Sequence, residues 1–593
     1  MFKFTDFLTR FEDKLFKISG FYSIKLKKDS FYLDEKQVKK YYFGKTHLSN
    51  RYHKLILDDK YVVFDKILTC DELQKYANEN LPFWKVSWRN FDPKDFWEIA
   101  RGWQWLPAII KAKEVNNTQE VINKIICWLD KNYYPNGLAW SVGLDVAIRA
   151  INLFIIYQIT QEQVLLKYIY DHFLYLKKMI YYSRGTIRNN HYLGELTSLA
   201  LLAYFFNAKN AGKLKKLLET EIKRQFFVDG INFEQSIRYH KFSLEFILLA
   251  KFFLGIGKEQ VLEKGAKFLL AVKKPDNTWP SIGDDDLGCV FRLNDNPLIE
   301  DYSDFLSLCV LFTKNKDLLI NDNDYLSPLA KFFCKDGQKI LKNISNQKKS
   351  QKTFLFPEGG YFIHRTGWQN NDSYLLIKFG PHRWHAHADL FHIELSIGGV
   401  PILVDSGTFR YNNVPQDRKY FRSTAAHNTL EFNDSDQTKQ FTNFRWCTPA
   451  KVIKWDLKED DEEFFFSATH DGYLKRFNIL HERDVSIDRN LNWIKITDII
   501  KGKGKGKGKA KIYWHFSPEL KIKKIEENNI TVYRDAMGIV KICLSSKNIF
   551  KISIIKTPYS PMYGVKREQP TLVIEFEKKD SDIIQMISKI GKI

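Results

Sequence analysis

The run Trp384-His385-Ala386-His387-Ala388-Asp389 places three side chains that bind metal ions or transfer protons close together. In an extended strand, residues two apart share a face, so His385, His387 and Asp389 would project together. Apolar residues at alternate positions from 391 to 397 would continue that face into a buried sheet. Imidazole and carboxylate groups are the usual ligands of zinc-like ions, and imidazole also transfers protons near neutral pH. The segment therefore predicts a strand that serves a metal site and a catalytic site together.

Two segments in the first half of the chain carry residues suited to the same active site. In RNNHYLGE (188–195), an asparagine pair ending in Asn190 precedes a helical pattern and is suited to cap it, which leaves His191 near the helix N-terminus. The segment FEQSIRYHKF (233–242) carries Tyr239 beside a further histidine. A lone histidine or tyrosine is more often structural than catalytic. Only the combination of these segments favours a site.

The elements that must position these residues change their periodicity along the chain. Residues 1–90 show helix-like and strand-like patterns together and are predicted as an N-terminal mixed segment. From 91 to 341, helical spacing without intervening strands, as in SVGLDVAIRAINLFIIYQI (141–159), predicts helix-on-helix packing as a solenoid or a closed α/α toroid. From 342 to 593, period-two patterns such as HIELSIGGVPILVDSG (392–407) predict an antiparallel β-sandwich. The fold class expected is therefore α+β with several domains.

Composition limits the classes of partner. The chain has 593 residues and a formal net charge of +21, which would attract nucleic acid, anionic lipid or an acidic polysaccharide, although biased genome composition explains the excess equally well. No nucleic-acid-binding motif accompanies the charge. The run KGKGKGKGKA (501–510) is predicted to be an exposed, flexible hairpin tip, with a polyanion contact as the alternative.

Cysteine usage and apolar stretches bear on the compartment. The chain has 7 cysteines and no CxxC pair, which predicts free thiols rather than a disulfide scaffold or a thiolate zinc site. Charged residues interrupt every apolar stretch at the N-terminus, so a secretory signal peptide is not expected, and no later stretch is expected to span a membrane. These features predict a soluble cytoplasmic protein, with a periplasmic or exported location as the alternative.

Several motifs resemble the heparinase II/III family of polysaccharide lyases, whose relatives include certain alginate lyases. The strongest likeness is GPHRWHAHADLFHIELSIGGVPILVDSGTFRY followed by YFRSTAAHNTL (380–430), and GLAWSVGLDVAIRAIN (137–152), NNHYLGE and FEQSIRYH occur in the family's order. The resemblance covers most of the chain from about Trp84 onward. It implies an incomplete α/α toroid followed by antiparallel β-sheet layers, in agreement with the periodicity.

The resemblance also implies roles for particular residues. In such lyases, a toroid Asn or His contacts the uronate carboxylate, while a Tyr and a His transfer protons. The matching positions are Asn190, His191, Tyr239 and His385. Where family members carry a structural divalent metal ion, with zinc the ion expected here, the matching ligands are His387, Asp405 and His427. Not all relatives are known to depend on that metal.

Four further residues are predicted to contact the substrate. Glu195 lies near His191 and would orient it or bind sugar, although a solvated helix face explains it equally well. Tyr411, Tyr420 and Arg422 precede His427 and are candidates for binding sugar or carboxylate, with a salt bridge at the sandwich edge as the alternative for Arg422.

The function predicted from these observations is a lyase that cleaves a uronate-containing acidic polysaccharide by β-elimination. A glycoside hydrolase on the same toroid is one alternative, because SIGDDDLG (281–288) offers paired carboxylates in Asp284, Asp285 and Asp286, although we favour a turn that closes the toroid. A catalytically silent carbohydrate-binding protein of surface-polysaccharide metabolism is the other. The lyase requires the toroid residues to meet His385 across the domain junction, with the metal ligands just behind.

Overall fold

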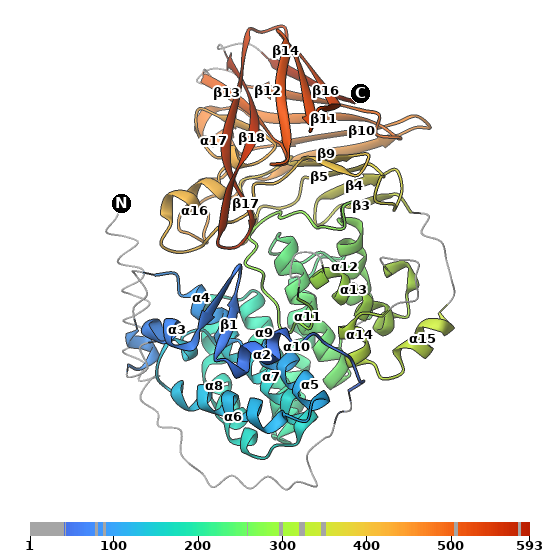
Figure 1. Cartoon of the computed structure of the whole chain (residues 1–593). Helices are drawn as coiled ribbons and strands as arrows, with labels where there is room; N and C mark the ends of the chain where they lie inside the picture. The colour runs from blue at the N-terminus through green and yellow to red at the C-terminus, as the bar shows by residue number, and fades with distance from the viewer. Residues whose placement is uncertain are drawn as a thin grey trace.

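The computed structural model describes residues 41, 43–77, 81–86, 91–257, 259–295, 300–319, 326–344, 351–502, 508–578 and 583–593. Helices occupy the N-terminal half of the chain and antiparallel sheets the C-terminal half, as the periodicity predicts. Figure 1 shows helices α2 to α15 gathered in one body, with the sheets stacked on one side of it.

The helices described are α2 (Arg51–Leu57), α3 (Cys70–Ala77), α4 (Lys94–Ala100), α5 (Trp105–Glu114), α6 (Thr118–Lys131), α7 (Gly143–Thr160), α8 (Val164–Thr186), α9 (Asn190–Phe205), α10 (Ala211–Gln225), α11 (Ile237–Leu254), α12 (Glu259–Ala271), α13 (Glu300–Thr313), α14 (Pro328–Phe333), α15 (Gly337–Asn343), α16 (Pro415–Phe421) and α17 (Leu474–Phe477). The 3-10 helices are η2 (Phe83–Lys85), η3 (Leu138–Trp140), η4 (Lys316–Leu318) and η5 (Thr424–Ala426).

The helices form an inner and an outer layer of an incomplete α/α toroid. Alternate helices α5, α7, α9, α11 and α13 contact one another in succession, while α6, α8, α10 and α12 pack outside their chain neighbours. Almost every residue of α7, α9 and α11 is buried, whereas α10 buries only one stripe. A helix that is apolar all round must be surrounded by others, so composition assigns each helix to its layer.

The described part of residues 1–90 packs against the toroid helices. Tyr52 and Ile56 of α2, and Tyr61 and Val63 of the first strand, belong to the same buried core as the toroid helices. Short elements without clear periodicity concealed this packing in the sequence.

The strands form antiparallel sheets that follow the helices. A small hairpin joins β1 (Lys60–Val63) and β2 (Lys66–Thr69). The five-stranded sheet contains β3 (Thr353–Phe356), β4 (Tyr361–Arg365), β5 (Tyr374–Lys378), β6 (Ile393–Ile397) and β7 (Val400–Leu403) in that order. The four-stranded sheet has the order β17 (Phe550–Met562), β18 (Val565–Lys578), β13 (Gly508–His515), β8 (Leu430–Phe432). The eight-stranded sheet has the order β14 (Leu520–Glu526), β15 (Asn529–Arg534), β16 (Met537–Ser545), β19 (Ile584–Lys592), β12 (Trp493–Lys501), β11 (Leu480–Asp488), β10 (Glu463–His470), β9 (Val452–Glu459).

The five-stranded sheet joins the two halves of the protein. Tyr361 and Ile363 of β4 belong to the core shared with the helices, whereas Phe362 between them belongs to the core shared with the other sheets. Because side chains alternate across a strand, the sheet is covered on both faces. This explains why β4, β5 and β6 are buried along their whole length. Figure 1 shows β3, β4 and β5 between the helices and the outer sheets.

Two predictions about single segments need correction. The run 501–510 is not a hairpin tip, because β12 before it and β13 after it belong to different sheets; residues 503–507 lie outside the described part. Among the described residues, α7 has the length and mean hydropathy of a membrane span, although none was predicted. That window is 83% buried inside the protein, so α7 is a core helix.

A glycine at the start of β4 provides a test of how the sheet holds the segment that leads to His385. Gly360 has φ +71°, and a Cβ there would lie 1.9 Å from the Cα of Gly380. We expect Gly360→Ala to lower the free energy of unfolding by roughly 2 kcal/mol or more, because strained backbone and a backbone clash coincide. Gly212→Ala in α10, where a Cβ meets nothing within 4 Å, is the control and should be neutral or stabilising. Equal melting temperatures for both variants in thermal unfolding would contradict this.

Candidate active site

A cavity of about 380 Å³ lies where the toroid meets the loops of the sheet half. Five of the predicted site residues line it, namely Asn190, His191, Tyr239, His385 and Tyr411. Aromatic rings of Trp97, Phe242, Trp384 and Phe444 form much of the remaining wall. The structure therefore brings together the predicted catalytic set, from segments nearly 200 residues apart.

Three toroid helices begin at this cavity. Asn189 is the N-cap of α9, as the sequence predicts, and its side chain accepts a hydrogen bond from the backbone N–H of His191. Ser236 caps α11 in the same way by accepting from the backbone N–H of Tyr239. The start of α7 contributes Asp145 to the wall. Helix N-termini carry partial positive charge, so their convergence favours an anionic group in the cavity.

The segment that carries His385 is not a strand, contrary to the prediction. Strand β6 begins only at Ile393, and the backbone of His385 bonds to the helical half, donating to Glu234 and accepting from Asp284. These contacts replace the strand pairing that the alternating pattern suggested. Asp389 was predicted to project beside His385 and His387. Instead, both its carboxylate oxygens accept hydrogen bonds from Lys378 Nζ at 2.6 Å.

Tyr239 and His385 are stacked. Their ring centroids lie 4.0 Å apart with an interplanar angle of 4°, and the Tyr239 hydroxyl lies 3.1 Å from the hydroxyl of Tyr411. Burial, followed by the nearby carboxylates of Asp286 and Asp284, raises the pKa of Tyr239 well above its usual value. The phenol therefore keeps its proton at neutral pH.

Glu234 organises the toroid side of the site, and sequence reasoning did not single it out. Its buried carboxylate accepts hydrogen bonds from the backbone N–H of Asn190 at 2.9 Å and from Asn190 Nδ2 at 2.8 Å. The same carboxylate lies 3.3 Å from His385 Nε2. Burial raises the pKa of Glu234, an effect that His385 and Asn190 partly offset. The only signal was its place in the FEQSIRYH motif.

Asp284 organises the other side, although the sequence favoured a simple turn there. The segment has no regular secondary structure, but the Asp284 carboxylate is buried and accepts from His385 Nδ1 at 2.9 Å and His387 Nε2 at 3.0 Å. Arg418 of α16 donates to both its oxygens, with Nη2 at 2.8 Å. Burial alone would raise the pKa of Asp284, but Arg418 and the histidines hold it well below its usual range.

Four charged residues in the cavity wall form two ion pairs. Lys94 Nζ lies 2.7 Å from the Asp286 carboxylate, and Arg101 Nε donates to Asp145 at 2.7 Å. Burial would raise the pKa of Asp286, but Lys94 and Arg101 lower it to about 2. The wall therefore carries fixed charges of both signs at neutral pH.

His387, Asp405 and His427 cluster behind the cavity. Their ligand atoms all lie within 4.8 Å of one another, and His427 Nδ1 lies 2.9 Å from Asp405 Oδ2. His387 Nδ1 and His427 Nε2 are buried and have no hydrogen-bond partner among the described residues. Buried imidazole nitrogens normally have a partner. The donor types and the unpartnered nitrogens therefore fit a divalent cation such as zinc.

Three residues predicted to bind substrate do not line the cavity. Glu195 is buried beneath it, where Ser183 donates to its carboxylate at 2.6 Å. Tyr420 packs beside Phe421 on α16. The guanidinium of Arg422 lies 4.1 Å from the centre of the Trp446 ring and donates to a backbone carbonyl. No described carboxylate pairs with it, so the alternative of a salt bridge is not observed either.

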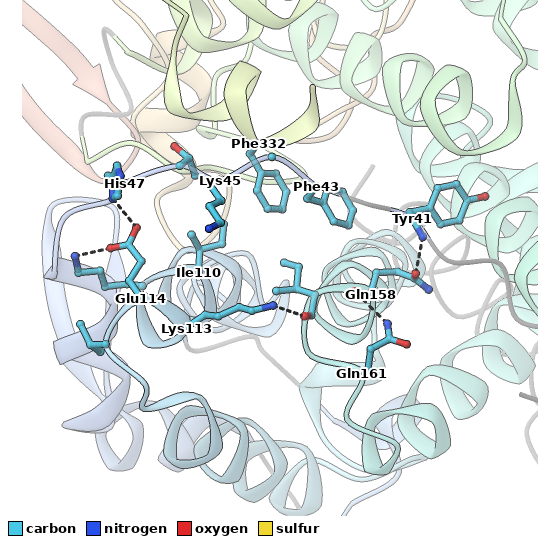
Figure 2. Close-up of a pocket in the computed structure, with 15 residues that line it drawn as sticks. Tyr41, Phe43, Lys45, His47, Ile110, Lys113, Glu114, Gln158, Gln161 and Phe332 are labelled. Carbon is cyan, nitrogen blue, oxygen red and sulfur yellow. Dashed lines mark hydrogen bonds and ion pairs between the residues drawn. The ribbon is translucent and has the colours of Figure 1, made fainter. Parts of the chain in front are cut away.

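A larger cavity of about 980 Å³ lies elsewhere, at the opposite end of α7 (Figure 2). Gln158 and Ile159 in the last turn of the helix line it, and Lys113 Nζ donates to the carbonyl of Ile159. Figure 2 shows Phe43 and Phe332 side by side in its wall, where their rings stack at 4.6 Å. None of the predicted site residues line it.

Comparisons with known proteins agree with this architecture. A model of the heparinase II/III-like C-terminal domain matches residues 348–587, and one of the heparinase II/III N-terminus matches residues 84–308. A heparin-sulfate lyase from Pedobacter heparinus is 24% identical over 396 residues, covering 63% of this chain and 52% of that protein. The chain thus spans about half the length of this curated relative.

Solved structures share the fold. A crystal structure of heparinase III has a TM-score of 0.70 at 15% identity, covering 97% of this chain and 88% of the other. A chondroitin AC lyase from Streptomyces coelicolor A3 has a TM-score of 0.50 at 11% identity, covering 88% and 78%. The fold is thus that of an α/α toroid followed by antiparallel sheets. Together with the two matched domain models, it shows that the chain belongs to the heparinase II/III family.

The position of Glu195 leads to a test with two readouts. Burial raises its pKa to about 8, so the folded state disfavours the carboxylate. In the unfolded chain the pKa of Glu195 is near 4.5. As pH rises from that value towards about 8, the wild-type protein should lose stability relative to Glu195→Gln, because the carboxyl group ionises readily only after unfolding. Unfolding free energies at both ends of this range would test it. A difference in unfolding free energy between the two proteins that does not change with pH would contradict this explanation. A large rise in KM for Glu195→Gln would also contradict it, since Glu195 does not reach the cavity.

Proposed function

We propose that this protein is a polysaccharide lyase that cleaves a uronate-containing acidic polysaccharide by β-elimination. The observation that carries the proposal is the stacked pair of Tyr239 and His385 in one cavity with Asn190 and His191. A sugar ring in that cavity would meet groups suited to stabilise its carboxylate and to exchange protons with it.

Carboxylate stabilisation is the first requirement of the reaction. Removal of the proton at C5 places a second negative charge on the uronate carboxylate, so donors must already be aimed at it. Asn190 and His191 lie in the first turn of α9, where the helix dipole also favours negative charge. Burial lowers the pKa of His191 to about 4, so its ring would act as a neutral donor at neutral pH.

Proton transfer is the second requirement. A base must remove the C5 proton while an acid protonates the departing glycosidic oxygen. The raised pKa of Tyr239 supports the acid role, because a protonated phenol can deliver its proton to that oxygen. His385, stacked on the phenol ring, would then serve as the base. The carbon–oxygen bond breaks as the C4–C5 double bond forms, leaving an unsaturated uronate end.

The relatives support an acidic polysaccharide as the substrate class. The curated relative is named a heparin-sulfate lyase, and one solved relative is a chondroitin AC lyase in complex with chondroitin sulphate. The net charge of +21 agrees with a polyanionic substrate. The hydrolase alternative lacks support, because Asp284 and Asp286 are both engaged in buried ion pairs. The intact catalytic set likewise gives no support to a silent binding protein.

We also propose that His387, Asp405 and His427 hold a structural divalent metal ion, with zinc expected. When bound, the ion would join the His385 loop to the residues after β7 and before β8, and so order the wall of the site. The unpartnered nitrogens of His387 and His427 support this proposal.

Tyr239→Phe tests the proposed acid. It removes the hydroxyl alone, so we expect at least an approximately 100-fold fall in kcat, the usual range for loss of an acid–base group. Ultraviolet absorbance of unsaturated ends, measured over a panel of acidic polysaccharides, is the assay. Tyr192→Phe in α9 is the control, since that hydroxyl has no partner among the described residues and does not line the cavity. A Tyr239→Phe variant retaining more than about a tenth of the rate would exclude the acid role.

His385→Ala and His387→Ala should separate chemistry from metal binding. The first should lose activity while zinc content stays unchanged, and the second should lose zinc and thermal stability, because a bound ion stabilises the state that binds it. Zinc content and melting temperature measured on purified protein decide between them. Equal zinc content in the two variants would argue against assigning His385 to catalysis and His387 to metal binding.

A further inference from the structure

We propose that Asp284 is a positioning residue that fixes the proton on opposite nitrogens of two neighbouring histidines. Its Oδ2 lies 2.9 Å from Nδ1 of His385, and its Oδ1 lies 3.0 Å from Nε2 of His387. One carboxylate thus contacts the residue proposed for proton transfer and a residue proposed to hold the metal. The catalytic half of this inference rests on the proposed lyase function, whereas the metal-binding half does not depend on turnover.

The proton positions follow from the chemistry of the contacts. An ionised carboxylate has only acceptors, so each ring nitrogen that faces it must carry a hydrogen. His385 therefore holds its proton on Nδ1, and His387 holds its proton on Nε2. Nε2 of His385 is the ring nitrogen outside this contact, and it lies 3.3 Å from a carboxylate oxygen of Glu234. Nδ1 of His387 is left without a hydrogen, and it is the buried nitrogen with no partner among the described residues.

Arg418 keeps this carboxylate charged and in place. Its Nη1 and Nη2 donate to separate oxygens of Asp284, and both side chains are 1% exposed. The guanidinium also donates to the backbone carbonyl of Asn443 and lies 4.7 Å from the centre of the Tyr411 ring. A bidentate arginine pair fixes the plane of a carboxylate as well as its charge. Each oxygen is therefore aimed at its own histidine.

The geometry predicts that the two sites depend on one residue. Residues that hydrogen-bond to metal-bound histidines typically change metal affinity by about 10 to 100-fold. Loss of the hydrogen bond from His385 would also free its ring to adopt the wrong tautomer or to turn away from Tyr239. A residue that merely stabilised the fold would lower the melting temperature without this joint effect.

Asp284→Asn is the direct test. An amide can accept on only one of its two atoms, so at most one histidine can still donate a hydrogen bond to residue 284. We expect kcat to fall about 100-fold or more with KM changed less than about threefold, and Zn²⁺ affinity to fall about 10-fold or more. Excess Zn²⁺ should restore metal occupancy but not kcat. Loss of only one property, or of neither, would overturn the joint role.

Asp285→Asn is the matched control. It changes the adjacent carboxylate, which pairs with Arg238 at 3.1 Å and does not line the cavity. Its kcat and Zn²⁺ affinity should remain within about threefold of the wild-type values. If the wild-type protein produces no unsaturated ends, the proposed function fails, while Zn²⁺ affinity and proton position still test Asp284.

Removal of the charge from Asp284 leaves Arg418 buried without its partner, which destabilises proteins strongly. The double variant Asp284→Asn/Arg418→Gln removes both charges, and it should fold while showing the same joint loss. A measurement on the wild-type protein does not depend on whether any variant folds. In ¹⁵N NMR of histidine-labelled protein, His385 should carry its hydrogen on Nδ1 and His387 should carry it on Nε2. The variants His385→Gln and His387→Gln assign the signals to the two residues. The reverse tautomer at either residue would overturn the proposal.

Discussion

The buried carboxylate of Asp284 is the interaction on which the site depends. A charge removed from water is tolerated only when it is paired and hydrogen-bonded. The partners of Asp284 come from the His385 loop and from α16, both in the sheet half. Asp284 itself belongs to the helical half. Satisfying this one charge therefore brings the two halves together at the point where the chemistry is proposed to occur.

The rest of the architecture supports that junction. Inner helices α7, α9 and α11 begin at the cavity, so their N-terminal turns aim backbone donors and Asn190, His191 and Tyr239 towards one place. The five-stranded sheet, covered on both faces, holds the segments on either side of the His385 loop. The loop itself is irregular because its backbone bonds to the toroid rather than to a neighbouring strand. The proposed lyase chemistry needs such a junction, since the groups proposed to bind the carboxylate and the residue proposed to accept the proton belong to different halves of the chain.

Much of this was accessible from the sequence, because periodicity reports burial. Helical and alternating patterns separated the two halves, and the Asn189 cap before His191 followed from local chemistry. Long-range pairing was not accessible. Asp284 looked like part of a turn because nothing local shows that a carboxylate will be buried against two histidines. Glu195 looked like a site residue because it lies one helical turn from His191, yet its side chain points to Ser183. The alternation around His385 suggested a strand because sequence patterns do not reveal a competing backbone partner.

The proposed division of roles across the junction can be tested by a crystal structure of the Tyr239→Phe protein with a uronate oligosaccharide bound. We expect a uronate ring in the junction cavity, with its carboxylate against Asn190 and His191 and its C5 within reach of His385. The glycosidic oxygen should lie beside the ring at position 239. An oligosaccharide bound only in the larger cavity at the far end of α7, or with its carboxylate turned away from α9, would contradict the account.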